Sequence, residues 1–146
     1  MQQGGLRMID EIAIQQTINT YTDGASRRDW DQLLSTFAPG GVWEIPGLKA
    51  RYDNPTAMLQ VMTAFVERMA YFVQINSPAV ISVQGDKATA RCMIRECGKF
   101  ADRDEALEIL GRYDDDLVRT DKGWKFARRA FYAFGQHRFP LVPASQ

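Results

Sequence analysis

The sequence predicts an α+β fold in which three N-terminal helices pack on one face of a curved, mostly antiparallel sheet. Three observations support this prediction. Apolar residues recur at helical spacing in the first half of the chain, stretches of strand-like alternation fill the second half, and short polar turns join those stretches. Because short turns connect antiparallel neighbours, we expect a meander that curves over the helices and encloses an apolar pocket at its open end.

Each predicted helix carries one apolar stripe with a recognisable start or stop. The first begins near Asp10. Asp29, followed three residues later by Gln32, resembles a capping box and opens a short second helix that Pro39-Gly40-Gly41 stops. Asn54-Pro55 caps the third helix and supplies a first-turn proline. The stripes are Ile14, Ile18, Tyr21 and Ala25; Trp30, Leu33, Leu34 and Phe37; and Met58, Met62, Phe65 and Met69.

The expected strands are rich in β-branched and aromatic residues and are separated by turn residues. Pro78 predicts a bulge or bend within the long β-rich stretch at residues 71–83. The predicted strands are residues 42–45, 71–83, 87–98, 106–120 and 124–137. We expect a single domain over residues 1–146, with its core at about 8–137.

Composition excludes several classes of protein. The 146 residues suit one domain, and 18 Lys+Arg balance 18 Asp+Glu, so no basic excess favours nucleic-acid binding. No apolar run is long enough to span a bilayer, so we expect no membrane association. The first ten residues, MQQGGLRMID, lack the apolar segment of a signal peptide, which makes the cytoplasm the expected location.

The residues that usually mark metal and nucleophile chemistry are sparse. Cys92 and Cys97 lie five apart on one predicted strand, so they point to opposite faces and cannot pair with each other. With one histidine, His137, and no CxxC spacing, we expect no metal site. A nucleophile elbow, a P-loop and a GxGxxG motif are also missing from the sequence. His137 ends the last predicted strand, where exposure is more typical than catalysis.

Several segments together resemble the SnoaL-like branch of the NTF2-like superfamily, also called the cystatin-like α+β cone fold. The resemblance covers roughly residues 8–137 and implies the NTF2-like cone: three helices on a curved sheet that encloses a pocket. The matching segments are Tyr21, Arg28-Asp29-Trp30-Asp31, Val42-Trp43-Glu44, Asn54-Pro55, residues 85–90 (GDKATA) and residues 111–129 (GRYDDDLVRTDKGWKFARR).

What the resemblance implies for catalysis depends on individual positions. Relatives include dehydratases, ketosteroid-type isomerases, polyketide cyclases, a dehydrochlorinase and non-catalytic dioxygenase small subunits. Dehydratase-like members pair an Asp, five residues after a Tyr, with a His near the start of the long second strand. Here Ser26 takes the Asp position, Val73 is the expected His equivalent, and a second His would fall near Gly98. The absence of this pair disfavours scytalone-dehydratase or bile-acid-dehydratase chemistry.

Two residues remain as catalytic candidates. Tyr21 lies on the inward helical stripe, where its phenol could donate a hydrogen bond to a substrate oxygen, or could simply be a core tyrosine. Glu96 shares strand parity with the apolar residues Cys92 and Ile94, and burial of its carboxyl group would raise the pKa and suit acid–base chemistry. The alternative for Glu96 is an ion pair with an arginine such as Arg128 or Arg112.

Five further residues are candidate ligand contacts. The family match and strand parity place Tyr113 and Asp115 on the cavity face, although the Asp114–Asp116 run could instead be solvated. The family match also brings Trp43, Tyr71 and Val73 to the pocket. The many aromatic residues and methionines suit either a bulky apolar ligand or a filled core, and the sequence leaves both open.

Two classes of function follow from these residues. The first is a lyase, dehydratase or isomerase without a cofactor that acts on a ring ketone or hydroxylated polycycle through one acid–base group. The second is a non-catalytic binding or assembly module, including a dioxygenase-small-subunit-like role, which the missing Asp/His pair favours. Family habit further predicts a homodimer through the outer sheet face, where Arg91, Arg95 and Arg119 are expected to point.

Overall fold

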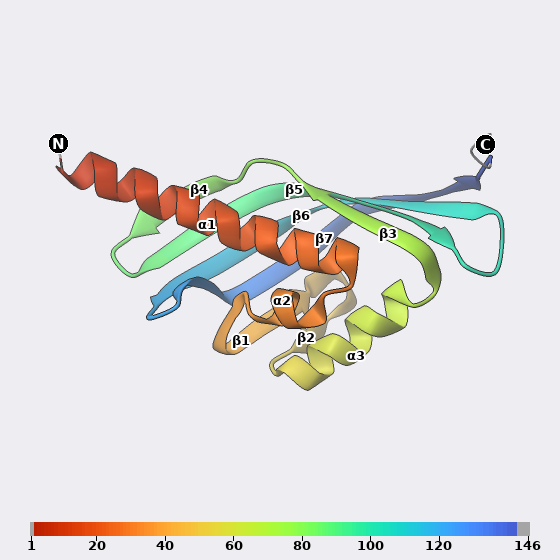
Figure 1. Cartoon of the computed structure of the whole chain (residues 1–146), viewed down its shortest axis with the longest axis horizontal. Coiled ribbons are helices and arrows are strands. Elements are labelled where there is room, and N and C mark those ends of the chain that lie inside the picture. The colour runs from red at the N-terminus through yellow and green to blue at the C-terminus, as the bar shows by residue number, and fades with distance from the viewer. Residues whose placement is uncertain (1, 143–146) are drawn as a thin grey trace.

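The computed structural model describes residues 2–142 and contains three α-helices, one 3-10 turn and a single seven-stranded sheet. Figure 1 shows α1 running across one face of the sheet, with α2 and α3 near the C-terminal end of α1. The elements are α1 (Gln2–Arg27), α2 (Trp30–Leu34), β1 (Phe37–Ile45), η1 (Pro46–Leu48), β2 (Ala50–Tyr52), α3 (Pro55–Val66), β3 (Met69–Asn76), β4 (Val80–Gln84), β5 (Lys87–Phe100), β6 (Glu105–Thr120) and β7 (Gly123–Pro140).

The sheet has the order β2-β1-β7-β6-β5-β3. The strand β4 pairs with residues 87–91 of β5, whereas β3 pairs with residues 94–100 of the same strand. Every pairing is antiparallel except that of β1 with β7, which is parallel. The predicted α+β class, three helices on a curved and mostly antiparallel sheet, is therefore confirmed. The parallel pairing was not predicted, because Pro39-Gly40-Gly41 was interpreted as a helix stop although it lies inside β1.

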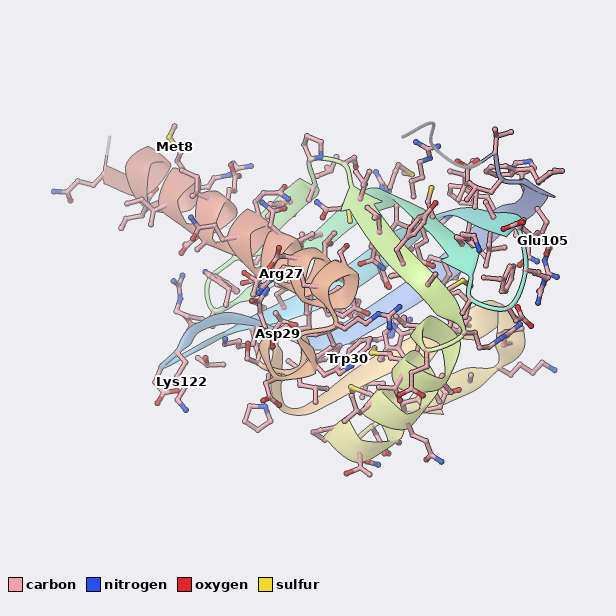
Figure 2. All side chains as sticks on the ribbon, turned by 45° about the vertical axis from the view of Figure 1, so that its right-hand side comes forward. Met8, Arg27, Asp29, Trp30, Glu105 and Lys122 are labelled. Carbon is pink, nitrogen blue, oxygen red and sulfur yellow. The ribbon has the colours of Figure 1, made fainter. Side chains whose placement is uncertain are left out.

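The helix caps follow the predicted chemistry. The Asp29 carboxylate accepts a hydrogen bond from the backbone N–H of Gln32 at 3.0 Å, and Asn54 accepts one from Ala57 at 2.9 Å. Arg28, at φ 61°, adopts the left-handed conformation that ends α1. Figure 2 shows Arg27, Asp29 and Trp30 in succession where α1 gives way to α2.

Several predicted boundaries were wrong. The second and third helices end before Phe37 and Met69, which begin β1 and β3. The first helix begins at Gln2 rather than near Asp10, and the β-rich stretch at 71–83 is two strands, β3 and β4, separated at residues 77–79 around Pro78. The longer helix also corrects the position of Arg119. Its guanidinium donates hydrogen bonds to both carboxylate oxygens of Asp10, at 2.8 and 2.9 Å, so this side chain faces α1 and not the outer sheet face.

The core lies between the helices and the inner face of the sheet. It combines the α1 stripe with alternate residues of β3, β5, β6 and β7. At one point β6 and β7 approach closely: a Cβ at Gly111 would collide with the carbonyl oxygen of Tyr132 and the ring of Phe131. Glycine therefore permits the irregular β6–β7 register that presents Phe131 to the interior.

Candidate functional site

A cavity of about 650 Å³ opens between the helices and the curved sheet. Its wall is mostly apolar and aromatic, and residues of α1, α2, α3, η1, β1, β3, β5, β6 and β7 contribute to it. Size and lining are those of small-molecule sites, which combine an apolar wall with a few polar groups. Among the candidate residues, those in the wall are Tyr21, Trp43, Glu96 and Tyr113.

Glu96 and Gln74 form the main polar feature of this wall. They face each other across the β3–β5 ladder, and Gln74 Nε2 donates a hydrogen bond to Glu96 Oε1 at 2.7 Å. Burial raises the pKa of Glu96 from 4.5 to about 7, although the hydrogen bond from Gln74 acts in the opposite direction. This carboxyl group can therefore both accept and donate a proton near neutral pH.

The expected alternative, an ion pair on Glu96, is wrong. Arg128 donates to Glu44 at 2.8 Å, and Arg112 pairs with Asp114 at 3.2 Å. No lysine or arginine belongs to the described cavity wall, so nothing cationic there holds Glu96 ionised. Because Glu96 is buried without a cationic partner, its pKa is raised.

The phenols of Tyr21 and Tyr113 lie 3.3 Å apart, oxygen to oxygen, in the same wall. Burial raises the pKa of Tyr21 to about 12 and that of Tyr113 well above its ordinary value. Both groups therefore remain protonated near neutral pH. One of the two O–H groups donates to the other phenol oxygen, so the pair has one O–H left for a ligand oxygen, and neither phenol is a base.

Behind the two phenols lies a fully buried ion pair. Arg129 Nε donates to Asp115 Oδ1 at 3.1 Å, and neither side chain is exposed. The guanidinium carbon of Arg129 lies 3.7 Å from the Tyr113 ring centre and 4.2 Å from that of Tyr21. Burial raises the pKa of Asp115 to about 7 against the opposing effect of Arg129. Asp115 does not belong to the cavity wall, so its expected place in contact with the ligand is wrong; it holds the cation that supports the phenols.

Tyr71 and Val73 also lie elsewhere than expected. They are 47% and 42% exposed and do not line the cavity, because alternation along β3 turns their neighbours Phe72 and Gln74 inwards. The inward position that the sequence interpretation assigned to Val73 is occupied by Gln74. Alternation alone could not have found this, because the outward set of Tyr71, Val73 and Ile75 is more apolar than the inward pair of Phe72 and Gln74.

Ser26, which the resemblance led us to expect at the position of the dehydratase-like Asp, makes structural contacts. Its hydroxyl accepts a hydrogen bond from the Gln74 backbone N–H at 2.8 Å and donates one to the Gln74 carbonyl at 3.3 Å. The side chain thereby fixes β3 against α1. It positions Gln74, and through Gln74 it positions Glu96.

The remaining candidates lie outside this arrangement. His137 has a side chain that is 65% exposed, 3.6 Å from Glu108 and away from the cavity wall. Among residues 2–142, no three or more His, Cys, Asp or Glu side chains gather as a metal ion would need. No helix within this range combines the length and apolar character that crossing a membrane requires.

A family model for the SnoaL-like domain matches residues 7–130 of the chain. The chain belongs to the SnoaL-like domain family. An uncharacterized protein of Mycobacterium tuberculosis, Rv2910c, is 28% identical over 124 aligned residues, and the match covers 82% of this chain and 82% of the other.

Solved structures of other proteins share the fold of this SnoaL-like protein. The hexachlorocyclohexane dehydrochlorinase LinA-type3 of Novosphingobium barchaimii superposes with a TM-score of 0.82 at 20% identity, covering 94% of this chain and 97% of the other. A Streptomyces avermitilis protein of the NTF2-like family gives a TM-score of 0.74 at 16% identity, covering 86% and 96%. The cone fold named from the sequence is thereby confirmed.

Proposed function

We propose that the cavity binds a bulky, apolar small molecule and that Glu96 transfers a proton to or from it in a lyase- or isomerase-type reaction. One observation carries this proposal: Glu96 is the one carboxyl group in the described wall, it lacks a cationic partner, and its pKa of about 7 lies near neutrality. A protein of the same fold, from Novosphingobium barchaimii, is a dehydrochlorinase, which supports an elimination or related step.

The chemistry uses groups that the chain itself supplies. Ionised Glu96 takes a proton from a ligand carbon next to a carbonyl group, and the C–H electron pair moves to the carbonyl oxygen as an enolate. Tyr21 and Tyr113 stay protonated, and the phenol that accepts the hydrogen bond within this pair has its own O–H available to that oxygen. Neutral Glu96 then returns the proton to another carbon in an isomerisation. In an elimination, the enolate instead expels a leaving group.

A second candidate is a binding module without chemistry, in which the cavity only holds the ligand. The observation that favours it is that neither Ser26 nor Gln74 adds a titrating group beside Glu96: the Ser26 hydroxyl is bonded to the Gln74 backbone, and Gln74 carries an amide that does not titrate. In this case Glu96 and Gln74 would recognise the ligand and nothing more.

Hydrogen exchange separates the two candidates without the natural substrate. In heavy water, wild-type protein should accelerate exchange of the C2 protons of 1-indanone, with a rate that rises as pH passes about 7 because the ionised carboxylate is the base. Glu96→Gln should bind 1-indanone but lose the acceleration. Glu108→Gln, which removes a carboxylate outside the cavity wall, is the matched control and should behave like wild type. Exchange no faster than in buffer, or equal for wild type and Glu96→Gln, contradicts the enzymatic proposal.

We further infer that two copies associate through the outer face of the sheet. Large apolar side chains are exposed there on adjacent strands: Tyr71, Val73 and Ile75 of β3 (47%, 42% and 54%), Met93 of β5 (47%) and Leu110 of β6 (37%). Their strands are adjacent in the β3–β5–β6 ladder. Exposed apolar area of this kind marks interaction surfaces, which supports the homodimer.

A further inference from the structure

Two large apolar side chains of the cavity wall are open to solvent. They are Leu48 of η1, which is 74% exposed, and Phe134 of β7, which is 60% exposed. A wall residue that is also exposed to solvent lies where the cavity meets the surface, so these two side chains mark the mouth. Single exposed apolar residues are common on proteins, but Leu48 and Phe134 belong to one cavity.

The topology brings the two side chains to the same end of the cavity. The strand β1 runs parallel to β7, with Glu44 opposite Ala130 as the last pair of their ladder, and both segments continue from there in the same direction. The turn η1, which follows β1, therefore lies beside the next residues of β7 and contacts that strand. Lys49, at φ 53°, ends η1, and the chain then turns back into β2, which leaves Leu48 at the tip.

The polar groups that the proposed reaction uses lie deeper than the mouth. Tyr21 and Tyr113, the pair that supplies an O–H to the ligand carbonyl, are each 2% exposed. Glu96 is close enough to both phenols to raise the pKa of each electrostatically. The reacting ketone therefore occupies the buried part of the cavity, and the mouth receives another part of the same ligand.

The mouth is apolar and carries no charge. No charged residue of η1 or β7 belongs to the described wall. A compact ligand at the buried end would leave Leu48 and Phe134 in water. An apolar group that extends from the ligand across the mouth would cover both side chains, which is favourable because apolar surface is removed from water.

We propose that the ligand is a ring ketone with a long apolar substituent: the ketone lies at the buried end, and the substituent leaves the cavity across Leu48 and Phe134. This inference rests on the proposed function, because it concerns the ligand of the same cavity. Leu48 and Phe134 select for the substituent and take no part in the proton transfer.

A series of 1-indanones with an unbranched alkyl chain at C5 tests the proposal, because C5 lies at the end of the ring system away from the ketone and C2. The probes are 1-indanone and its 5-methyl, 5-propyl and 5-hexyl derivatives. Calorimetric titration of the wild-type protein should show an affinity that rises about fourfold for each methylene that lies against the wall. The rate of C2 proton exchange at saturation should be nearly equal for the three alkyl derivatives, because the reacting end is unchanged.

Two variants assign the chain-length effect to the mouth. Leu48→Ser and Phe134→Ser should each weaken binding of 5-hexyl-1-indanone about tenfold and leave the affinity for 1-indanone within about twofold of wild type. Phe139→Ser is the matched control, because Phe139 is also an exposed phenylalanine of β7 but does not belong to the cavity wall. This variant should bind every probe like wild type.

A spectroscopic readout needs no variant. In wild-type protein with carbon-13-labelled leucine methyl groups, the terminal methyl group of 5-hexyl-1-indanone should show a nuclear Overhauser effect to the methyl groups of Leu48. An affinity that does not rise with chain length, or a rise that survives both Leu48→Ser and Phe134→Ser, would overturn this inference. Exchange of the C2 protons of 1-indanone that depends on Glu96 would then leave the proposed function standing. Uptake of none of the probes would overturn both.

Discussion

Replacement of Glu96 by glutamine should stabilise the protein at alkaline pH and leave its stability nearly unchanged at acidic pH. The cause is the burial that raises the pKa of this carboxyl group from 4.5 to about 7. An unfolded chain ionises Glu96 above about pH 4.5, whereas the folded protein keeps it neutral until about pH 7. Between these values the folded state binds more protons, so the free energy of unfolding falls as pH rises.

The difference between the two pKa values corresponds to roughly 3 kcal/mol, at 1.36 kcal/mol for each pKa unit. This destabilisation is absent below about pH 4.5, grows up to about pH 7 and is complete above it. The glutamine introduced by Glu96→Gln would carry no charge and could still hydrogen-bond to Gln74, so the variant escapes the effect. We expect it to be more stable than wild type by about 1–3 kcal/mol at pH 8 and nearly equal at pH 4.5.

Urea unfolding of both proteins at pH 4.5, 6 and 8 measures this difference directly. The matched variant Glu108→Gln should show the opposite trend, because Arg95 lowers the pKa of Glu108 and its ionised form stabilises the fold. If Glu96→Gln were less stable than wild type at pH 8, Glu96 would be an ionised structural residue. The proposed proton transfer near neutral pH would then be refuted.

Three other substitutions test the surrounding structure. Tyr21→Phe, which keeps the ring and removes the hydrogen bond to Tyr113, should lower stability by only ~0.5–1.5 kcal/mol in urea but weaken 1-indanone binding; unchanged binding would remove Tyr21 from the site. Arg129→Met should cost about 3–5 kcal/mol because Asp115 is left buried and unpaired, and adding Asp115→Asn should restore most of it; a loss that the second change does not reduce would contradict this reading. Val73→Lys should convert a dimer into a species near 16.6 kDa in sedimentation, whereas a wild-type protein already at that mass would reject the outer-face dimer.

Much of the fold could be predicted from local patterns. The spacing of Ile14, Ile18 and Tyr21 determines which side of α1 is buried, and the structure buries all three to within 2%. The start of α2 could be predicted from Asp29, because its capping hydrogen bond with Gln32 joins residues only three apart in the sequence. Such features depend on residues that are close in the sequence, so they can be predicted without knowledge of the tertiary structure.

Features that depend on distant partners could not be predicted in this way. The parallel pairing of β1 with β7 joins segments more than eighty residues apart, and the Pro39-Gly40-Gly41 sequence that it includes is typical of a turn. Arg119 meets Asp10 only because α1 extends beyond its apolar stripe. Neither the β1–β7 pairing nor the contact of Arg119 with Asp10 could be predicted from residue spacing within one segment.

In the candidate site, too, features set by nearby residues could be predicted, whereas features set by distant partners could not. Strand parity was enough to place Glu96 on the inner face, but which arginine, if any, would pair with it depended on the whole sheet. In β3, alignment to the family placed Val73 inwards, and a slip of one residue exchanges the two faces of a strand. Gln74 was missed for that reason, although it contacts Glu96 directly.

The most direct test of a proton-transferring Glu96 is a titration of its side-chain carboxyl carbon by carbon-13 NMR, with Glu96→Gln used to assign the resonance. The account predicts a midpoint at about pH 7, and a higher midpoint in Gln74→Met because the hydrogen bond from Gln74 lowers the pKa. A midpoint near the ordinary value of 4.5, unaffected by Gln74→Met, would contradict the account.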